Sequence, residues 1–173
     1  MYNTRTYEET QTRVAALIEN DPSISVPDLA STLEQTEAEV SLALPPEMVT
    51  PVEGAHAEAI LNLLPEWGPV TTIVISHGSV FEVKAPFPKG KFGRGYFNLM
   101  GENGELHGHL KLDLITDIGL ISKPFMGKES HHIAFYNGEG ACVFKVYLGR
   151  DEKRKLLPEQ LVKFQQLKKD FKK

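Results

Sequence analysis

Residues 95–111, GYFNLMGENGELHGHLK, contain side chains whose types and spacing could bind a metal or a metal cofactor. The Asn-Gly pair at 103–104 separates two runs of alternating apolar and polar residues, and it is the strongest short signal for a two-residue hairpin turn. Because side chains alternate between the two faces of a strand, Tyr96, His107 and His109 share one face of this hairpin. The segment therefore predicts a phenol and two imidazoles, a ligand set for a metal, on one sheet surface.

The turn also sets the register of the two strands. The predicted pairs, starting at the open end of the hairpin, are Tyr96 with Lys111, Asn98 with His109 and Met100 with His107. Tyr96 is then diagonal to His109, within reach of both long side chains. The opposite face is apolar and carries Phe97, Leu99, Leu106, Leu110 and Leu112. The alternative is that the polar face is simply the solvent-facing side of an antiparallel sheet.

The segment just before Tyr96, residues 89–95, is rich in glycine and basic residues. Its glycine spacing matches neither the P-loop nor the dinucleotide fingerprint, and it leads into a strand, so it offers no helix N-terminus to a phosphate. We interpret it as a mobile basic segment whose Lys89, Lys91 and Arg94 could pair with carboxylates at the mouth of a pocket. A plain solvated loop is the alternative.

Further histidines raise the alternative of a mononuclear zinc or iron site. His131 and His132 could contribute to one, but adjacent residues of a strand face opposite sides, so only one of them could join His107 and His109. No Asp or Glu stands at an obvious companion spacing. The sequence therefore disfavours a bare metal ion relative to a metal cofactor.

Composition limits the class of protein. The 173 residues are 41% hydrophobic, which fits one domain with a sizeable core. The single cysteine, Cys142, excludes an internal disulfide or a multi-cysteine metal site, and we predict it to be a small core residue. The chain has no apolar run of about 18 residues, which predicts a cytoplasmic protein without membrane insertion. Its net charge of −4 predicts no polyanionic partner.

The hydrophobic period changes near Trp67. Residues 1–65 read as a helical N-terminal region packed on the same domain, with a capping box at residues 36–39. Residues 66–173 read as an antiparallel sheet followed by a helix after Pro158. The predicted strands are 70–76, 80–84, 95–100, 106–112, 117–122, 132–136 and 141–148, with a second hairpin turn at 137–140. The predicted fold class is α+β, with a large antiparallel sheet of about seven or more strands in a single domain.

Residues 26–44 have the rhythm of a helix-turn-helix, which would indicate a DNA-binding regulator. Charge argues against this reading. Through Glu47 the chain has two basic residues and nine acidic ones, a net charge of −7, which a phosphate backbone would repel. We therefore expect no nucleic acid partner.

Several segments resemble the intracellular haem-utilisation carriers of the HutX/ChuX type. They are EWGPVTTIV at 66–74, GYFNLMGENGELHGHLK at 95–111, KPFMGKESHHIAFYNGEGACVFKVYLGRD at 123–151 and the KRKLLPEQ that follows. The resemblance extends over about residues 21–171. It implies a HemS/ChuX-like fold, a homodimer, and a cytoplasmic carrier that binds ferric haem after import and passes it to a haem-degrading partner. The alternatives it leaves are a haem-degrading enzyme and, more distantly, a haem-responsive regulator.

The resemblance also assigns individual residues. Tyr96 matches the position of a tyrosine that the family offers to ferric haem, and His109 matches a histidine implicated in haem binding. A further family histidine is replaced here by Ile75, which is a departure from the pattern. His77 lies two residues on and could substitute for it if the strand continues, although His77 and Gly78 could equally form a hairpin turn.

Phenolate is a hard oxygen donor that suits ferric iron. A free tyrosine has a pKa near 10, so a phenolate ligand needs a cationic or hydrogen-bonding neighbour, for which His109 and Arg94 are the candidates. Tyr96 and His109 are too close on one face to hold a flat ring between them. One of them is therefore expected to bind the haem iron while the other supports it.

Overall fold

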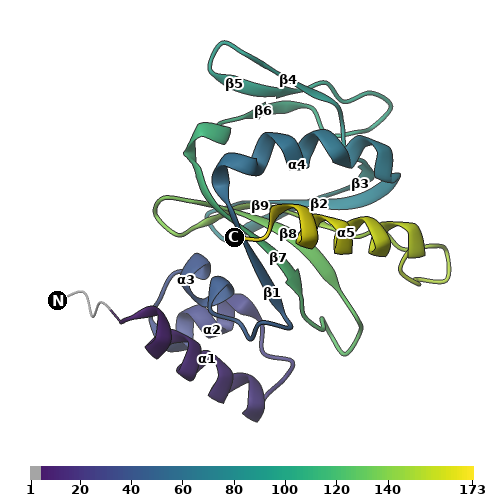
Figure 1. Ribbon diagram of the computed structural model, residues 1–173. Coiled ribbons are helices and arrows are strands. Elements are labelled where there is room, and N and C mark those ends of the chain that lie inside the picture. Colours follow the sequence, from purple (N-terminus) through teal and green to yellow (C-terminus); the bar gives the residue numbers. More distant parts are fainter. Residues whose placement is uncertain (1–4) are drawn as a thin grey trace.

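Nine strands lie in two antiparallel sheets in the computed structural model, which describes residues 5–173 (Figure 1). The first sheet has six strands in the order β1-β7-β8-β9-β2-β3, and the second has three in the order β4-β5-β6. The α+β class is confirmed, with the strands divided between two sheets. Their bounds are Val49–Glu53 (β1), Pro69–Ser76 (β2), Ser79–Pro86 (β3), Gly90–Gly93 (β4), Tyr96–Leu99 (β5), Gly108–Leu110 (β6), Ile115–Ser122 (β7), His131–Asn137 (β8) and Cys142–Tyr147 (β9).

Five α-helices accompany the sheets within residues 5–173. They are Tyr7–Asn20 (α1), Val26–Leu33 (α2), Glu37–Leu42 (α3), Ala57–Leu63 (α4) and Pro158–Phe171 (α5), with short 3-10 turns at Gly54–His56, Leu64–Trp67 and Leu112–Leu114. The predicted capping box at Thr36 is confirmed, because its hydroxyl accepts from the Glu39 amide while the Glu39 carboxylate accepts from the Thr36 amide. Thr6 and Glu9 start α1 in the same way.

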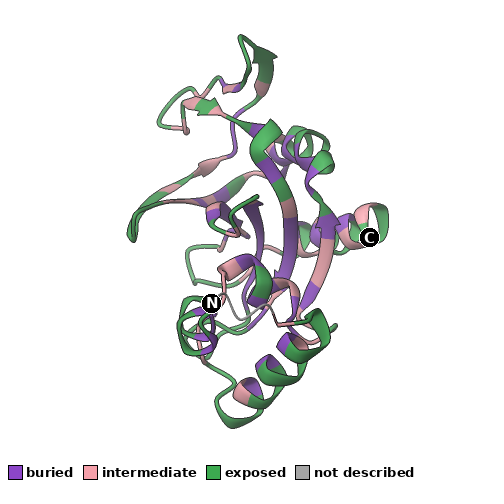
Figure 2. Ribbon diagram, turned by 90° about the vertical axis from the view of Figure 1, so that its left-hand side faces the viewer, coloured by how far each residue is buried: buried purple, intermediate pink, exposed green. Residues whose placement is uncertain are grey.

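The six-stranded sheet separates two hydrophobic cores. Helices α1–α3 cover one face, where Val14 and Leu29 pack with Tyr136 of β8. The other face packs against α4, α5 and the three-stranded sheet, where Phe135 meets Phe164 and Phe97. Figure 2 shows the buried residues concentrated along the central strands, whereas the three-stranded sheet at the top of Figure 1 is largely exposed. That small sheet is attached to the core by one face only.

Cys142 is buried in the core that α1–α3 form, as predicted. Burial raises the pKa of its thiol to about 12. A thiol in this environment stays protonated near neutral pH and is inert, because the thiolate is the reactive form.

Two strands lie where none was predicted. β1 falls inside the range read as helical and pairs with β7 at the edge of the six-stranded sheet. β4 occupies the segment read as a mobile basic loop and pairs with β5. Gly90 allows that pairing, since a Cβ atom at this position would lie 2.3 Å from the Phe97 ring. The glycine-rich composition of this segment therefore serves close packing, and the interpretation as a loop was wrong.

Helix α3 is committed to the protein core. Val40 and Ser41 are fully buried, and α3 packs against β1 and β7. The amide of Ala38 also donates to the Gly140 carbonyl in the β8–β9 turn, at 3.0 Å. A recognition helix must present its side chains to a DNA groove. The buried setting of α3 thus adds to the charge argument against DNA binding.

Candidate functional site

The exposed face of the three-stranded sheet carries the predicted phenol and imidazole groups. Asn98 pairs with His109, so the predicted register is confirmed. Phe97 and Leu99 are buried beneath the sheet, whereas Tyr96 is 42% exposed. Side-chain alternation has therefore divided this sheet into an apolar face and a face available for chemistry.

The predicted Asn-Gly turn is also present. Asn103 and Gly104 both have positive φ angles, of 51° and 85°, and the Glu105 amide donates to the Glu102 carbonyl at 3.0 Å. The strand pairing nevertheless stops at Leu99, so the expected pairing of Met100 with His107 does not form. His107 is exposed beyond the end of the sheet.

Tyr96 and His109 lie next to each other. Their ring centroids are 5.8 Å apart with the rings at 64°, an edge-to-face arrangement. This spacing leaves no room for a flat macrocycle between the two rings. Both groups could instead act on one side of a ligand that lies over the sheet.

Asn98 sets the orientation of His109. Its Nδ2 group donates to the carbonyl oxygens of Lys91, Gly93 and Tyr96 at 3.1, 3.1 and 3.2 Å. The Oδ1 atom of Asn98 therefore faces His109 Nδ1 as an acceptor, at 2.6 Å. His109 then carries its proton on Nδ1 and keeps a lone pair on Nε2. Sequence reasoning missed this role, although the predicted pairing of Asn98 with His109 was the signal for it.

Within residues 5–173, the cation found over the Tyr96 ring is that of Lys111. The Lys111 ammonium group lies 5.1 Å from the Tyr96 ring centroid, donates to the Gly95 carbonyl at 3.1 Å and pairs with Asp113 at 3.5 Å. Arg94 occupies the two-residue turn between β4 and β5 with a φ of 54°. The predicted pairing of Tyr96 with Lys111 already implied that this ammonium group lies beside the phenol, but Lys111 was not predicted to be its cationic neighbour.

His77 lies apart from this group. Ser76 pairs with Ser79, so His77 and Gly78 form the β2–β3 turn, and the strand on which a substitute ligand would sit ends before His77. His77 lines a surface groove beside the start of α3 and the β8–β9 turn. Within residues 5–173, no hydrogen bond or ring contact joins it to Tyr96 or His109.

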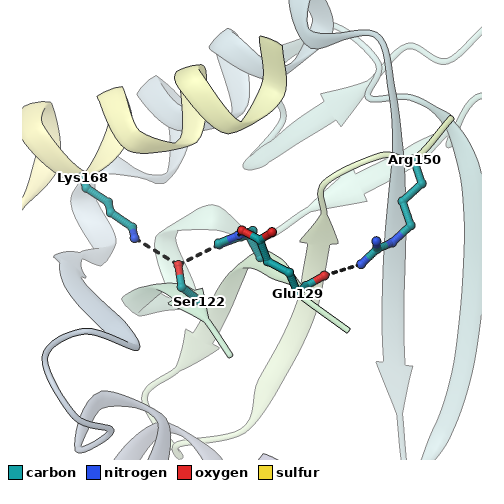
Figure 3. Close-up of polar contacts among 5 residues, drawn as sticks. Ser122, Glu129, Arg150 and Lys168 are labelled. Carbon is teal, nitrogen blue, oxygen red and sulfur yellow. Dashed lines mark hydrogen bonds and ion pairs between the residues drawn. The ribbon is translucent and has the colours of Figure 1, made fainter. Parts of the chain in front are cut away.

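His131 belongs to a polar network that joins β7, β8 and α5. Its Nδ1 lies 2.8 Å from the Ser122 hydroxyl and its Nε2 lies 2.9 Å from the Glu129 carboxylate. The Lys168 ammonium donates to Ser122 at 3.0 Å, and Arg150 donates to the Glu129 carbonyl (Figure 3). Both ring nitrogens of His131 are engaged, so the network supports packing and leaves no free ligand atom.

His132 points to the other face of the sheet, as adjacent residues in a strand must. It is buried, its ring stacks on Tyr147 with 4.4 Å between centroids, and neither ring nitrogen has a hydrogen-bond partner among residues 5–173. Burial, and then the charge of Lys145, holds its pKa well below the ordinary 6.5. In the described part of the chain, no three His, Cys, Asp or Glu side chains gather as a metal-ion site.

Among the helices of residues 5–173, none is both long enough and apolar enough to span a membrane.

The fold and the site define a small α+β protein with a phenol–imidazole pair on an exposed sheet. A family model described as "Haem utilisation ChuX/HutX" matches residues 50–167, more than half of the chain. The chain therefore belongs to this family, as its sequence resemblance implied.

Individual relatives agree with this assignment. The chain is 55% identical over 168 residues to the intracellular heme transport protein HutX of Vibrio cholerae serotype O1, a match covering 97% of this chain and 87% of that protein. The structure of the heme binding protein ChuX is 33% identical, with a TM-score of 0.81 over 90% of this chain and 97% of that one. The heme degrading enzyme ChuS of Escherichia coli O157:H7 shares the fold at 22% identity, with a TM-score of 0.71 over 83% of this chain and 43% of ChuS.

Proposed function

We propose that this protein is a cytoplasmic carrier that binds ferric haem on the exposed face of the three-stranded sheet and passes it to a haem-degrading partner. The observation that carries this proposal is the Tyr96–His109 pair, with the His109 tautomer set by Asn98. The names of the Vibrio and ChuX relatives support it, because one is an intracellular heme transport protein and the other binds heme.

The residues present fit ferric haem as cargo. Tyr96 offers a hard oxygen ligand, and His109 Nε2 has a lone pair on the neighbouring strand. When iron binds the phenol oxygen, the phenol proton must leave, and the proposed acceptor is Nε2 of the neighbouring His109 ring. The resulting imidazolium would then stabilise the phenolate by charge and hydrogen bonding. This arrangement makes Tyr96 the ligand and His109 its support.

An exposed site with one protein ligand suits transfer. Tyr96 is on an open sheet and leaves the opposite side of a bound haem free of any ligand from this sheet. Release then requires the loss of a single iron–oxygen bond, whereas a closed cage with two ligands would have to open first. This accessibility favours a carrier over an enzyme, which must exclude water and hold its cofactor through the reaction.

Aerobic incubation of the haem complex with ascorbate distinguishes a carrier from a degrading enzyme. We expect the Soret band to persist, with catalase present to remove free peroxide, and haem to move to an added apo-haem protein such as apomyoglobin. Steady bleaching of the Soret band with release of iron and an open tetrapyrrole would contradict the carrier proposal.

The proposal includes a homodimer. β3 is an edge strand of the six-stranded sheet, and it exposes Val80 (58%) and Phe81 (60%), which point to opposite faces. A strand edge with apolar groups on both faces is a surface that proteins normally cover. A second copy of the chain is the occupant that the family resemblance implies.

Phe81→Glu should convert the dimer to a monomer, because it places a charge in the surface that the second copy would cover. Light scattering after size-exclusion chromatography measures the mass directly. Val162→Glu, at a 70% exposed position on α5, is the matched control and should leave the mass unchanged. A wild-type monomer, or a Phe81→Glu protein that remains dimeric, would contradict this interface.

Asn98→Leu should weaken ferric haem binding by about tenfold, because removing a partner that orients a ligand typically costs 10–100-fold in affinity. The loss should be smaller in a His109→Ala background, since Asn98 is proposed to act in part through that ring. Asn62→Leu, on the exposed side of α4, is the control. An equal loss with and without His109 would mean that Asn98 serves only the backbone of β4.

A further inference from the structure

The outer edge of the three-stranded sheet carries Lys91 and Arg94, neither of which has a carboxylate partner within residues 5–173. Lys91 of β4 pairs with Asn98, and Arg94 lies in the turn that leads to Tyr96. Both are exposed. None of the ion pairs found within residues 5–173 involves either one. Lys111, a further cation of the face, is already engaged with Asp113 and the Gly95 carbonyl.

Lys91 shares the face on which Tyr96 and His109 lie. Residues paired across an antiparallel ladder point the same way, and Lys91, Asn98 and His109 form one row across the sheet. Two strand spacings separate the ends of that row, about 10 Å. The ammonium group of Lys91 is therefore available to the rim of a flat ligand whose centre lies over Tyr96 and His109.

The backbone that carries these cations is held in place. Asn98 Nδ2 donates to the carbonyl oxygens of Lys91 and Gly93, which braces β4 against β5. Arg94 and Gly95 form a two-residue turn, with φ angles of 54° and 80°. The same side chain thus sets the His109 tautomer and positions the strand and turn from which Lys91 and Arg94 project.

We infer that Lys91 and Arg94 bind the two carboxylates of the cargo, so the site recognises a dicarboxylate tetrapyrrole by its acid groups as well as by its metal. The inference rests on the proposed function. A haem carries both propionates on one edge of the ring, and an arginine or lysine makes strong, charge-assisted hydrogen bonds to a carboxylate. Tyr96 recognises the iron, while the β4 edge recognises the carboxylates.

Three ligands separate these two kinds of recognition: ferric protoporphyrin IX, its dimethyl ester, and metal-free protoporphyrin IX. Each is titrated into the wild type, into Lys91→Gln/Arg94→Gln, and into Tyr96→Phe. Lys169→Gln/Lys172→Gln, at exposed positions in the last turn of α5 and directly after it, removes the same charge outside the three-stranded sheet and serves as the control. The conservative pair Lys91→Arg/Arg94→Lys tests for rescue.

We expect Lys91→Gln/Arg94→Gln to bind both free-acid ligands about tenfold more weakly and to bind the dimethyl ester like the wild type, in line with exposed ion pairs. The conservative pair should restore binding, and Tyr96→Phe should affect only the two iron-bearing ligands. Equal losses for acid and ester, or equal losses in the α5 control, would overturn the inference while leaving the iron site intact. Failure of the wild type to bind any ferric ligand saturably would instead overturn the proposed function.

Discussion

Tyr96→Phe should abolish the phenolate-to-iron charge-transfer band of the ferric haem complex and weaken haem binding by at least about tenfold. The change removes one oxygen atom, and that atom is the proposed ligand. Because Tyr96 is 42% exposed and its hydroxyl makes no hydrogen bond among the contacts of residues 5–173, the fold should be unaffected. Absorption spectra during a haem titration give both the band and the affinity.

Tyr7→Phe is the matched control for this change. Tyr7 is 52% exposed on α1, remote from the three-stranded sheet, and its variant should bind haem like the wild type. A Tyr96→Phe complex with an unchanged spectrum and affinity would remove Tyr96 from the coordination of iron. In that outcome His109 would become the leading candidate, because its Nε2 makes no hydrogen bond within the described residues.

The second large effect is expected at His132 and concerns the stability of the fold rather than haem binding. Its ring is buried and stacked on Tyr147, and both ring nitrogens lack hydrogen-bond partners within residues 5–173. An unsatisfied buried polar group costs about 1–3 kcal/mol. His132→Phe keeps an aromatic ring for the stacking and removes the polar atoms. It should therefore raise the free energy of unfolding by about 1 kcal/mol near pH 7.

The same residue should make stability depend on pH. Burial depresses the pKa of His132 in the folded state, so below its ordinary value of 6.5 the unfolded chain binds a proton that the native state excludes. His132 therefore does not lower the free energy of unfolding through protonation above pH 6.5. Below that pH the free energy of unfolding falls by about 1.4 kcal/mol per pH unit, until the pKa of His132 in the folded state is reached. His132→Phe should lose this one-proton slope below pH 6.5.

Urea unfolding at a series of pH values measures both effects. His107→Gln, at an exposed histidine, should leave the slope unchanged. His132→Leu provides a second variant in case the larger phenylalanine ring strains the core. If both variants retain the wild-type slope, other groups govern the acid response, and His132 is not the buried neutral histidine that the structure indicates.

Local signals explain why the centre of the site could be predicted. The Asn-Gly pair at 103–104 specifies a turn with two positive φ angles, and strand alternation then places Asn98 opposite His109. These rules act over a few residues and need no knowledge of the rest of the fold. The chemistry of the exposed face followed from them.

Strands with unusual composition were missed for identifiable reasons. β1 contains Pro51, which is tolerated because β1 is an edge strand, but a proline in so short a run hides it in the sequence. β4 contains two glycines with different roles. Gly90 leaves room for the Phe97 ring, and Gly93 leads into the turn that follows β4. Only the folded chain shows either partner.

Tertiary contacts decided the remaining residues. Whether His77 continued the strand or formed the turn was open in the sequence, and the β2–β3 register places it in the turn. Whether the ring nitrogens of His132 have hydrogen-bond partners is decided by the residues that pack around the ring. Neither of these could be obtained from residue spacing.

Paramagnetic broadening of backbone amide NMR signals by bound ferric haem tests the central claim most directly, because it locates the haem without any substitution. We predict saturation at one haem per chain and broadening centred on β4, β5 and β6. The His77 turn should be unaffected unless the second copy of the chain brings it close to the haem. Broadening centred on the β8–β9 turn and the start of α3, with the three-stranded sheet unaffected, would contradict the proposed site.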